Sequence, residues 1–315
     1  MRILITGGTG NLGSRLLVPL VQRGDQVVLF DLNPHPHVET VEFGRAVFVK
    51  GDLGNREDVF RSVRDHGIES IFHLGAVLSS VAEQQPALAW RTNMDGIINV
   101  YEAARLFGVK RVVFSSTVAT YGAGLPDPLP IDAPQWPVSL YGVTKVAGER
   151  LGIYYHYRFG IDFRAPRLPA VVAPHGAAGG VSAYCSGAFE ESILRGRYEF
   201  YINPTTRAPM LYITDAVRAL LELHDVSEAK LSRRVYNLAG ISPSAEEIAA
   251  AIQRRLPHVR ITYKPDPSRV SILESWPHQI NESEARCDWN WQATYDLGRM
   301  TDEIIEVLHH GPGKE

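Results

Sequence analysis

Cysteine is scarce in this sequence: its 315 residues include only Cys185 and Cys287. The two cysteines make no metal-ligand pattern, and their scarcity is typical of a protein from a reducing compartment. A charge excess of one sign is missing as well, since 32 Lys and Arg stand against 35 Asp and Glu, for a net charge of -3. The composition therefore carries no general electrostatic footprint for nucleic acid or for an anionic membrane.

Long apolar runs are also missing. Residues 1–6 hold one basic residue and then only Ile3, Leu4 and Ile5 as an apolar run before Gly7, which is too short for a signal peptide. No later apolar run is long enough to span a bilayer. We therefore expect a cytoplasmic protein that has no metal site and binds neither nucleic acid nor a membrane.

The first half of the chain alternates short apolar runs with helical patterns. The runs are rich in Val, Ile and Phe, and several are apolar at consecutive positions, as expected for strands covered on both faces. Strands are predicted at residues 3–6, 27–31, 46–49, 70–74, 112–115 and 162–167, with a late run at 234–238, and helices at 12–23, 56–66, 87–107 and 139–159. This alternation predicts right-handed βαβ units and a parallel sheet, that is, a Rossmann-type doubly wound α/β fold.

The second half is less regular. Prolines and a Gly179-Gly180 pair predict a loop over residues 169–180. Ser244-Ala245-Glu246-Glu247 has the form of a capping box and predicts a helix as far as Leu256. One strand with a turn is expected within 258–267, and a last helix at 296–308. We expect these segments to form a smaller C-terminal lobe that meets the sheet at a cleft.

A glycine-rich turn follows the first predicted strand directly and opens the first helix: Gly7-Gly8-Thr9-Gly10-Asn11-Leu12-Gly13. Small residues there let the backbone turn tightly and approach a pyrophosphate at the helix N-terminus. Asp31 ends the second strand, about 20 residues further on, where the acid that binds a ribose belongs. Its carboxylate would repel a 2′-phosphate, which favours NAD over NADP. The structural alternative for the glycine-rich segment is a plain tight turn, and the alternative for Asp31 is a strand-end Asp that caps a turn.

Tyr141 and Lys145 lie four residues apart in a predicted helix, so their side chains share one helix face. A free phenol has a pKa of about 10 and is a poor base at neutral pH. A fixed cation nearby favours the phenolate and lowers that pKa. The pair is therefore a candidate general acid/base unit for a substrate hydroxyl. Ser115, Ser116 and Thr117 end a strand upstream, where hydroxyls face the crevice of an open parallel sheet.

In this order and spacing, the glycine turn, Asp31, Asn93, the Ser-Ser-Thr strand end and the Tyr-x-x-x-Lys helix resemble the extended short-chain dehydrogenase/reductase superfamily, which includes the NAD-dependent epimerases and dehydratases. The resemblance covers essentially the whole chain. A narrower resemblance, to short-chain type L-threonine 3-dehydrogenases, is carried by residues 78–83, 141–149, 208–212, 261–266 and 274–277. Those enzymes use NAD to oxidise the threonine β-hydroxyl to a ketone.

The resemblance implies roles for individual residues. Tyr141 would be the base, Lys145 would lower its pKa and bind the nicotinamide ribose, and Thr117 would occupy the third catalytic position. Ser79, Ser80, Ser182 and Trp276 would join Thr117 and Tyr141 in binding the substrate, although Trp276 could equally be a core residue and Ser79 a serine that bonds its own loop. NAD would be held by Gly7, Gly10, Asn11, Leu12, Asp31, Asp52, Leu53, Leu74, Gly75, Ala76, Asn93, Ser115, Tyr141, Lys145 and Leu168.

With these roles the chain divides as follows. Residues 1–168 would form the NAD-binding domain, to which 211–239 would return, and 169–210 with 240–315 would form the substrate-binding lobe. The helices at 87–107 and 139–159 pair across a dimer in the superfamily, which predicts a homodimer. Ile97, Val100, Tyr101, Val146 and Tyr154 are apolar residues on them, and the alternative is a helix pair buried within the monomer.

The sequence departs from the threonine dehydrogenase pattern near the substrate. Those enzymes usually carry Gly-Gly-Thr-Thr-Asp-Tyr, whereas this loop reads Gly179-Gly180-Val181-Ser182-Ala183-Tyr184. An amino acid brings a carboxylate and an ammonium, which are costly to bury without partners. Two other functions stay open: a nucleotide-sugar epimerase or dehydratase with tightly bound NAD, and a non-catalytic NAD sensor or scaffold.

Overall fold

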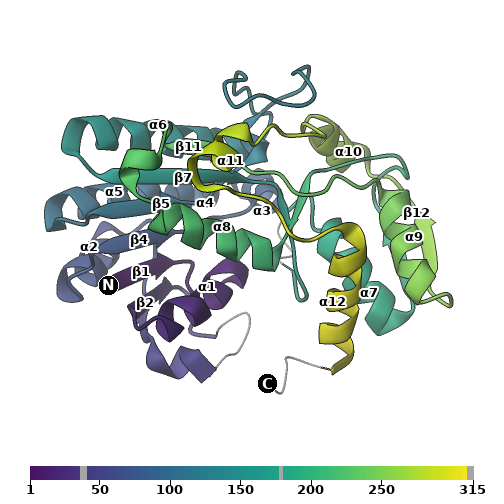
Figure 1. The fold of residues 1–315 in the computed structure, drawn as a ribbon, viewed down its shortest axis with the longest axis horizontal. Coiled ribbons are helices and arrows are strands. Elements are labelled where there is room, and N and C mark those ends of the chain that lie inside the picture. The colour runs from purple at the N-terminus through teal and green to yellow at the C-terminus, as the bar shows by residue number, and fades with distance from the viewer. Residues whose placement is uncertain (36–40, 177–179, 311–315) are drawn as a thin grey trace.

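The computed structural model of the chain describes residues 1–35, 41–176 and 180–310. Within these residues, seven parallel strands form the main sheet (Figure 1). The strands are β1 (Arg2–Thr6), β2 (Gln26–Asp31), β3 (Val47–Lys50), β4 (Ser70–His73), β5 (Arg111–Phe114), β7 (Asp162–Leu168) and β11 (Val235–Asn237). Their order is β11-β7-β5-β4-β1-β2-β3, and the short β6 (Ser116–Thr117) pairs with β7. The strand order changes direction between β1 and β4, which defines a Rossmann-type sheet.

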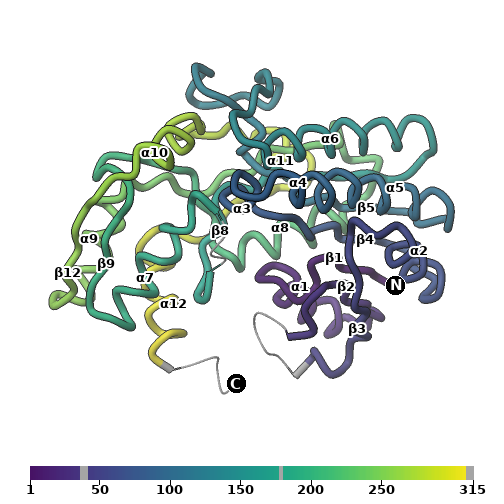
Figure 2. Tube along the Cα trace, turned by 180° about the vertical axis from the view of Figure 1, so that it is seen from behind, coloured from purple at the N-terminus to yellow at the C-terminus, as the bar shows by residue number. Residues whose placement is uncertain are grey.

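Helices cover both faces of the sheet (Figures 1 and 2). On one face α1 (Asn11–Gln22) and α8 (Ile213–Asp225) bury apolar side chains such as Leu16 and Leu220 against β1 and β2. On the other face α2 (Arg56–Asp65), α5 (Gly96–Phe107) and α6 (Leu140–Phe159) pack on a second cluster that includes Val63, Val100 and Phe163. The consecutive apolar positions of the strands are explained by this double cover.

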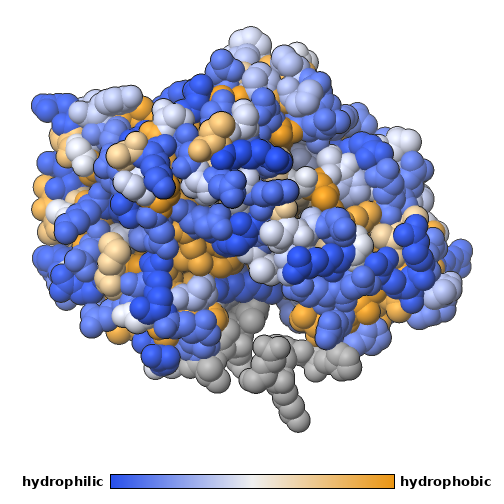
Figure 3. Space-filling model, viewed as in Figure 1, coloured by the Kyte–Doolittle hydropathy of each residue, from blue (hydrophilic) through white to orange (hydrophobic). Residues whose placement is uncertain are grey.

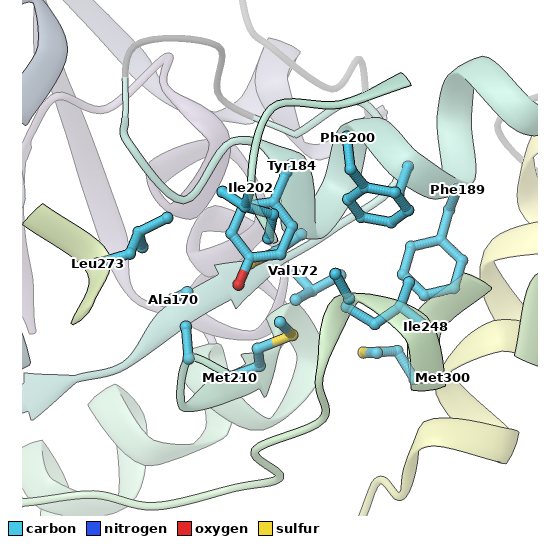
Figure 4. Packing of buried hydrophobic residues seen from close by; sticks show 14 of the residues in the cluster. Ala170, Val172, Tyr184, Phe189, Phe200, Ile202, Met210, Ile248, Leu273 and Met300 are labelled. Carbon is cyan, nitrogen blue, oxygen red and sulfur yellow. The ribbon is translucent and has the colours of Figure 1, made fainter. Parts of the chain in front are cut away.

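A smaller lobe lies beside the carboxyl ends of the strands (Figure 1). Its helices are α7 (Tyr184–Arg195), α9 (Ala245–Arg255), α10 (Pro267–Glu274) and α12 (Leu297–His310). Two strand pairs belong to it, β8 (Ala170–Val172) with β10 (Met210–Tyr212) and β9 (Arg197–Phe200) with β12 (Arg260–Tyr263). Phe189, Phe200, Ile248 and Met300 converge in its buried apolar core (Figure 4).

The predicted strands and fold class are confirmed, with differences at particular elements. The predicted helix at 87–107 consists of α4 (Pro86–Ala89), a π-helical segment (Trp90–Asp95) and α5. The predicted loop at 169–180 contains β8, because Ala170 and Val172 gain partners on β10. Ser244 does form the capping box with Glu247. The segment 211–239 packs on the sheet through α8 and β11, while the predicted domain boundaries stay a prediction.

Several short elements complete the chain. The helices α3 (Ser79–Gln84) and α11 (Ser283–Trp289) were not predicted, and 3₁₀ turns lie at Val41–Arg45, Val118–Thr120 and Glu228–Lys230. In the face shown in Figure 3, hydrophilic residues dominate and apolar ones are scattered. Among the described helices, none has the length and apolar character needed to cross a membrane.

Candidate active site

The carboxyl ends of the central strands finish level with one another. Thr6 of β1 is in register with Phe30 of β2 and with His73 of β4, and His73 is in register with Phe114 of β5. The segments that follow these strands therefore leave the sheet at one edge, which is where ligands bind in open α/β sheets.

A cavity of about 500 Å³ runs along this edge and ends against the smaller lobe. Its volume lies in the range of about 300–1,000 Å³ that is typical of small-molecule sites. Predicted site residues supply much of its lining: Gly7, Gly10, Asn11, Leu12, Asp31, Asp52, Leu53, Leu74, Gly75, Ala76, Ser79, Ser115, Thr117, Tyr141, Lys145, Leu168, Ser182 and Trp276. The structure thus brings together residues that are far apart in the sequence.

Two predicted site residues do not line the cavity. Asn93 is buried, and its amide bonds both the N–H and the carbonyl of Val77 at 2.8 and 3.1 Å and the Thr144 hydroxyl at 3.2 Å. It therefore fixes the segment after β4 from behind. Ser80 lies in α3 beside Ser79 and is likewise outside the lining.

The glycine turn has the backbone that a dinucleotide cradle needs. Gly7 has a φ of 65°, and a Cβ there would approach Gly75 Cα to 2.7 Å, so a larger residue would meet the neighbouring turn. Gly10 at the N-cap of α1 has no side chain to accept from the first-turn N–H groups, which leaves these donors for an anion. The turn therefore fits the pyrophosphate of a dinucleotide.

Asp31 lies at the same end of the cavity. One carboxylate oxygen accepts from the backbone N–H of Leu32 at 2.8 Å and of Asn33 at 3.3 Å, and the other from Thr9 at 3.3 Å. Asp31 thus caps the strand-end turn and also lines the cavity, while its binding of a ribose stays a prediction. The same region contains Asp52, whose carboxylate accepts from Gly54 N–H and from Arg91, each at 2.9 Å.

Tyr141 and Lys145 project from the first turns of α6, which begins where the Ser139 hydroxyl accepts from Gly142 N–H at 3.1 Å. Lys145 is almost fully buried, and its Nζ donates to Ser115 O at 2.6 Å and lies 5.5 Å from the Tyr141 ring centre. Burial lowers the pKa of Lys145 to about 7, against a smaller opposing effect of Glu149.

Tyr141 behaves differently from the sequence-based expectation. It keeps some exposed surface on the cavity, but burial raises its pKa above the ordinary phenol value. The expected lowering by Lys145 does not appear, because desolvation penalises the phenolate and favours a neutral Lys145 as well. Spatial proximity of the pair is as predicted, whereas the direction of the pKa shift is the opposite.

The third predicted catalytic residue is Thr117, which ends β6. Its hydroxyl oxygen accepts from Ala119 N–H at 3.2 Å and lines the same cavity as Tyr141. Acceptance by the oxygen leaves the hydroxyl proton available for a ligand oxygen.

The lobe side of the cavity is held by a contact between distant segments. The Ser79 hydroxyl accepts from Val181 N–H at 3.2 Å, while the Tyr201 hydroxyl donates to Val181 O at 3.0 Å and accepts from Tyr184 N–H at 2.9 Å. Ser79 therefore bonds the lobe rather than its own loop. Gly179, in the loop whose sequence differs from the threonine dehydrogenase pattern, lies outside the described residues. Trp276 belongs to the lobe core and also lines the cavity, and its role in binding the substrate stays a prediction.

Comparison with known proteins identifies the family. Residues 3–239 match the family described as NAD dependent epimerase/dehydratase. The chain belongs to this family. The predicted resemblance to the extended short-chain dehydrogenases/reductases is thereby confirmed.

Similar members of the NAD-dependent epimerase/dehydratase family carry threonine dehydrogenase names. A bovine (Bos taurus) protein named mitochondrial L-threonine 3-dehydrogenase is 37% identical over 315 residues, covering 98% of this chain and 83% of the bovine one. The structure of L-threonine dehydrogenase from Clostridium difficile matches with a TM-score of 0.91 and 34% identity, over 99% of this chain and 98% of that one. A monomeric L-threonine 3-dehydrogenase from a metagenome matches with a TM-score of 0.90 and 33% identity, over 99% and 100%.

Sequence reasoning missed part of the lining. Ala183 and Ser186 come from the start of α7, a helix that was not predicted, and Val77, Thr92 and Val171 from neighbouring segments. The Ser186 hydroxyl accepts from Ala173 N–H at 3.1 Å and so fixes the loop after β8. Ala183 directly follows Ser182, a predicted substrate-binding residue, in the loop that differs from the threonine dehydrogenase pattern. This adjacency could have indicated that Ala183 also lines the cavity.

Within the described residues, no group of three or more His, Cys, Asp or Glu side chains could hold a metal ion. The arrangement offers a dinucleotide cradle at one end and a phenol, an amine and several hydroxyls at the other.

Proposed function

We propose that this chain is an NAD-dependent dehydrogenase that oxidises the β-hydroxyl of L-threonine, or of a related small β-hydroxy compound, to a ketone. The observation that carries the proposal is one cavity lined by Gly7 and Asp31 at one end and by Thr117, Tyr141 and Lys145 at the other. The names of the similar proteins support the same reaction.

The residues at the glycine-turn end would hold NAD. Main-chain N–H groups after Gly10 would receive the pyrophosphate, and Asp31 would accept from the adenosine ribose hydroxyls. When bound, NAD supplies the acceptor for the hydride that leaves the substrate carbon. Ser115, through its carbonyl, fixes Lys145 at the other end.

Tyr141 would act as the general base. The substrate O–H bond breaks with its proton passing to the Tyr141 oxygen, and the C–H bond breaks with its electron pair leaving as hydride, so that a C=O bond forms. When Lys145 is protonated, its charge, 5.5 Å from the ring, would favour the phenolate and so oppose the effect of burial. Thr117 would donate its hydroxyl proton to the substrate oxygen and orient it toward Tyr141.

Mixing the protein with NAD and a panel of L-threonine, L-serine and 3-hydroxy acids and esters, and following NADH absorbance, tests this function. NADH formation with at least one of them is the expected result. A complete lack of reduction across the panel would contradict the proposal.

The alternative of a nucleotide-sugar epimerase or dehydratase has less support. This alternative was raised because Val181–Ala183 differ from the threonine dehydrogenase pattern, yet the similar proteins described above are dehydrogenases by name. Tightly co-purified NAD together with binding of a UDP-sugar would favour the alternative. Free exchange of NAD with added cofactor would count against it.

We further propose a homodimer built on α5 and α6. Ile97, Val100 and Tyr101 are buried within the monomer, as the alternative required, but both helices also carry exposed large apolar side chains. Ile98 is 43% exposed and Tyr157 is 81% exposed. Sedimentation should give twice the chain mass, and Ile98→Glu with Tyr157→Glu should give the single mass. A single mass for the unmodified protein, as the name of the metagenome relative indicates for that protein, would overturn the dimer.

A further inference from the structure

The charged side chains around the cavity are few and unevenly placed. Among its described lining residues, only Asp31, Asp52 and Lys145 carry a formal charge. Asp31 is engaged by the turn after β2, and Asp52 is paired with Arg91, so both carboxylates belong to the glycine-turn end.

The end near Tyr141 offers neutral groups only, apart from Lys145. Ser79, Thr117, Ser182 and Ser186 contribute hydroxyls, and Val171, Ala183 and Trp276 contribute apolar surface. Three of these four hydroxyl oxygens already accept a backbone N–H, Ser79 from Val181, Thr117 from Ala119 and Ser186 from Ala173. No carboxylate in the described lining could face a substrate bound beside Tyr141.

An α-amino acid brings two charges into this space. An ammonium that leaves water needs a carboxylate or a full set of acceptors, and an unpaired buried ion is strongly unfavourable. Lys145, the one basic side chain in the described lining, repels an ammonium when it is protonated. It could attract a carboxylate, but its Nζ is bonded to Ser115 O and it belongs to the Tyr141 pair.

We propose that this site selects a neutral β-hydroxy compound over a zwitterionic amino acid, and that Ala183 is the position that sets this preference. The proposal rests on the dehydrogenase function proposed above and narrows its substrate class. Ala183 is the N-cap residue of α7 and lines the cavity beside Ser182. A carboxylate there would supply the missing partner for an ammonium.

Four substrates separate the two charges. L-threonine carries both, racemic 3-hydroxybutyrate only the carboxylate, racemic 3-aminobutan-2-ol only the ammonium, and racemic methyl 3-hydroxybutyrate neither. We expect kcat/KM to be highest for the ester, at least about tenfold above L-threonine, because one unmatched buried charge commonly costs that much in discrimination. Of the two singly charged compounds, 3-aminobutan-2-ol, which carries only the ammonium, should have the lower kcat/KM.

The matched variants are Ala183→Asp and Ala183→Asn, which are of nearly equal size and differ in charge. Ala183 is the N-cap of α7, a position that Asp and Asn both suit, so both variants should fold, and circular dichroism checks this. Ala183→Asp should raise the L-threonine to ester ratio of kcat/KM by about tenfold, since a charge pair is gained, and Ala183→Asn should leave it within about twofold.

Each outcome bears on a different part of the proposal. NADH formation with L-threonine preferred over the ester would overturn the neutral-substrate inference and leave the dehydrogenase function standing. Equal ratios in the Asp and Asn variants would overturn the role of Ala183. No NADH from any of the four compounds, or from the wider panel, would contradict the dehydrogenase function, and the inference would fall with it.

Discussion

Glu149 of α6 and Arg167 of β7 form a two-point ion pair away from solvent. Arg167 Nε lies 2.8 Å from Glu149 Oε1, and Nη2 lies 2.7 Å from Oε2. Glu149 is fully buried, and the Ser116 hydroxyl also donates to it. Because Glu149 stands one helical turn after Lys145, the pair ties the helix that carries Tyr141 and Lys145 to the sheet.

Removing one member of this pair should destabilise the fold strongly. Glu149→Ala leaves the Arg167 guanidinium buried without its counter-ion, and we expect a loss of about 3–5 kcal/mol in the free energy of unfolding. Urea denaturation followed by circular dichroism measures it. The double variant Glu149→Leu with Arg167→Met, which removes both charges, should lose less than Glu149→Ala. An equal or larger loss in the double variant would show that the pair is not the source of the effect.

Tyr141→Phe should abolish most of the catalytic activity without loss of the fold. The phenyl ring keeps the packing and removes the proton-accepting oxygen, so kcat should fall by a factor of about 10²–10⁴. NADH binding, measured by its fluorescence, should change little. Tyr154→Phe on the same helix is the matched control, because Tyr154 is 52% exposed and does not line the cavity. Near-normal kcat in Tyr141→Phe would exclude Tyr141 as the base.

Asp31 should determine the choice between NAD and NADP. Asp31→Ser removes the carboxylate that faces the cavity and keeps a short polar side chain. We expect the kcat/KM ratio of NAD over NADP to fall by at least about tenfold, since a lost acceptor weakens NAD and a lost negative charge admits a 2′-phosphate. Steady-state rates with each cofactor measure the ratio. An unchanged ratio would mean that Asp31 only caps its turn.

Much of the sheet could be predicted from the sequence because its strands are apolar on both faces. Apart from the exposed Arg2, the residues of β1 and β4 are all buried, and no tertiary partner is needed to recognise these strands. The helix α7 was missed because part of its buried face is made of small and polar residues such as Cys185, Ser186 and Ser192, which hide the helical period. The strands β8 and β10 have three residues each and exist through pairing of Ala170 with Met210, a contact across 40 positions of sequence.

The candidate site shows the same division. Motif order placed the glycine turn, Asp31, Thr117, Tyr141 and Lys145 at one cavity, since each follows from local sequence and strand order. The bond between Ser79 and Val181 joins residues 102 positions apart, and only the packed lobe reveals it. Burial likewise decides the direction of the pKa shifts of Tyr141 and Lys145. For Tyr141, the spacing of the pair alone had predicted the opposite direction, a lowered pKa.

Lys145 should make the stability of the protein depend on pH in a defined direction. Burial lowers its pKa in the fold from 10.5 to about 7, so below about pH 7 the lysine is protonated in both states and the fold bears the cost of the buried charge. Between about 7 and 10.5 the unfolded chain holds a proton that the folded chain has released, and the free energy of unfolding rises with pH. Lys145→Met should remove this rise. Urea midpoints of both proteins at about pH 6.5 and about pH 9.5, without added NAD, measure the difference. Parallel pH profiles for the two proteins would contradict a lowered pKa at Lys145.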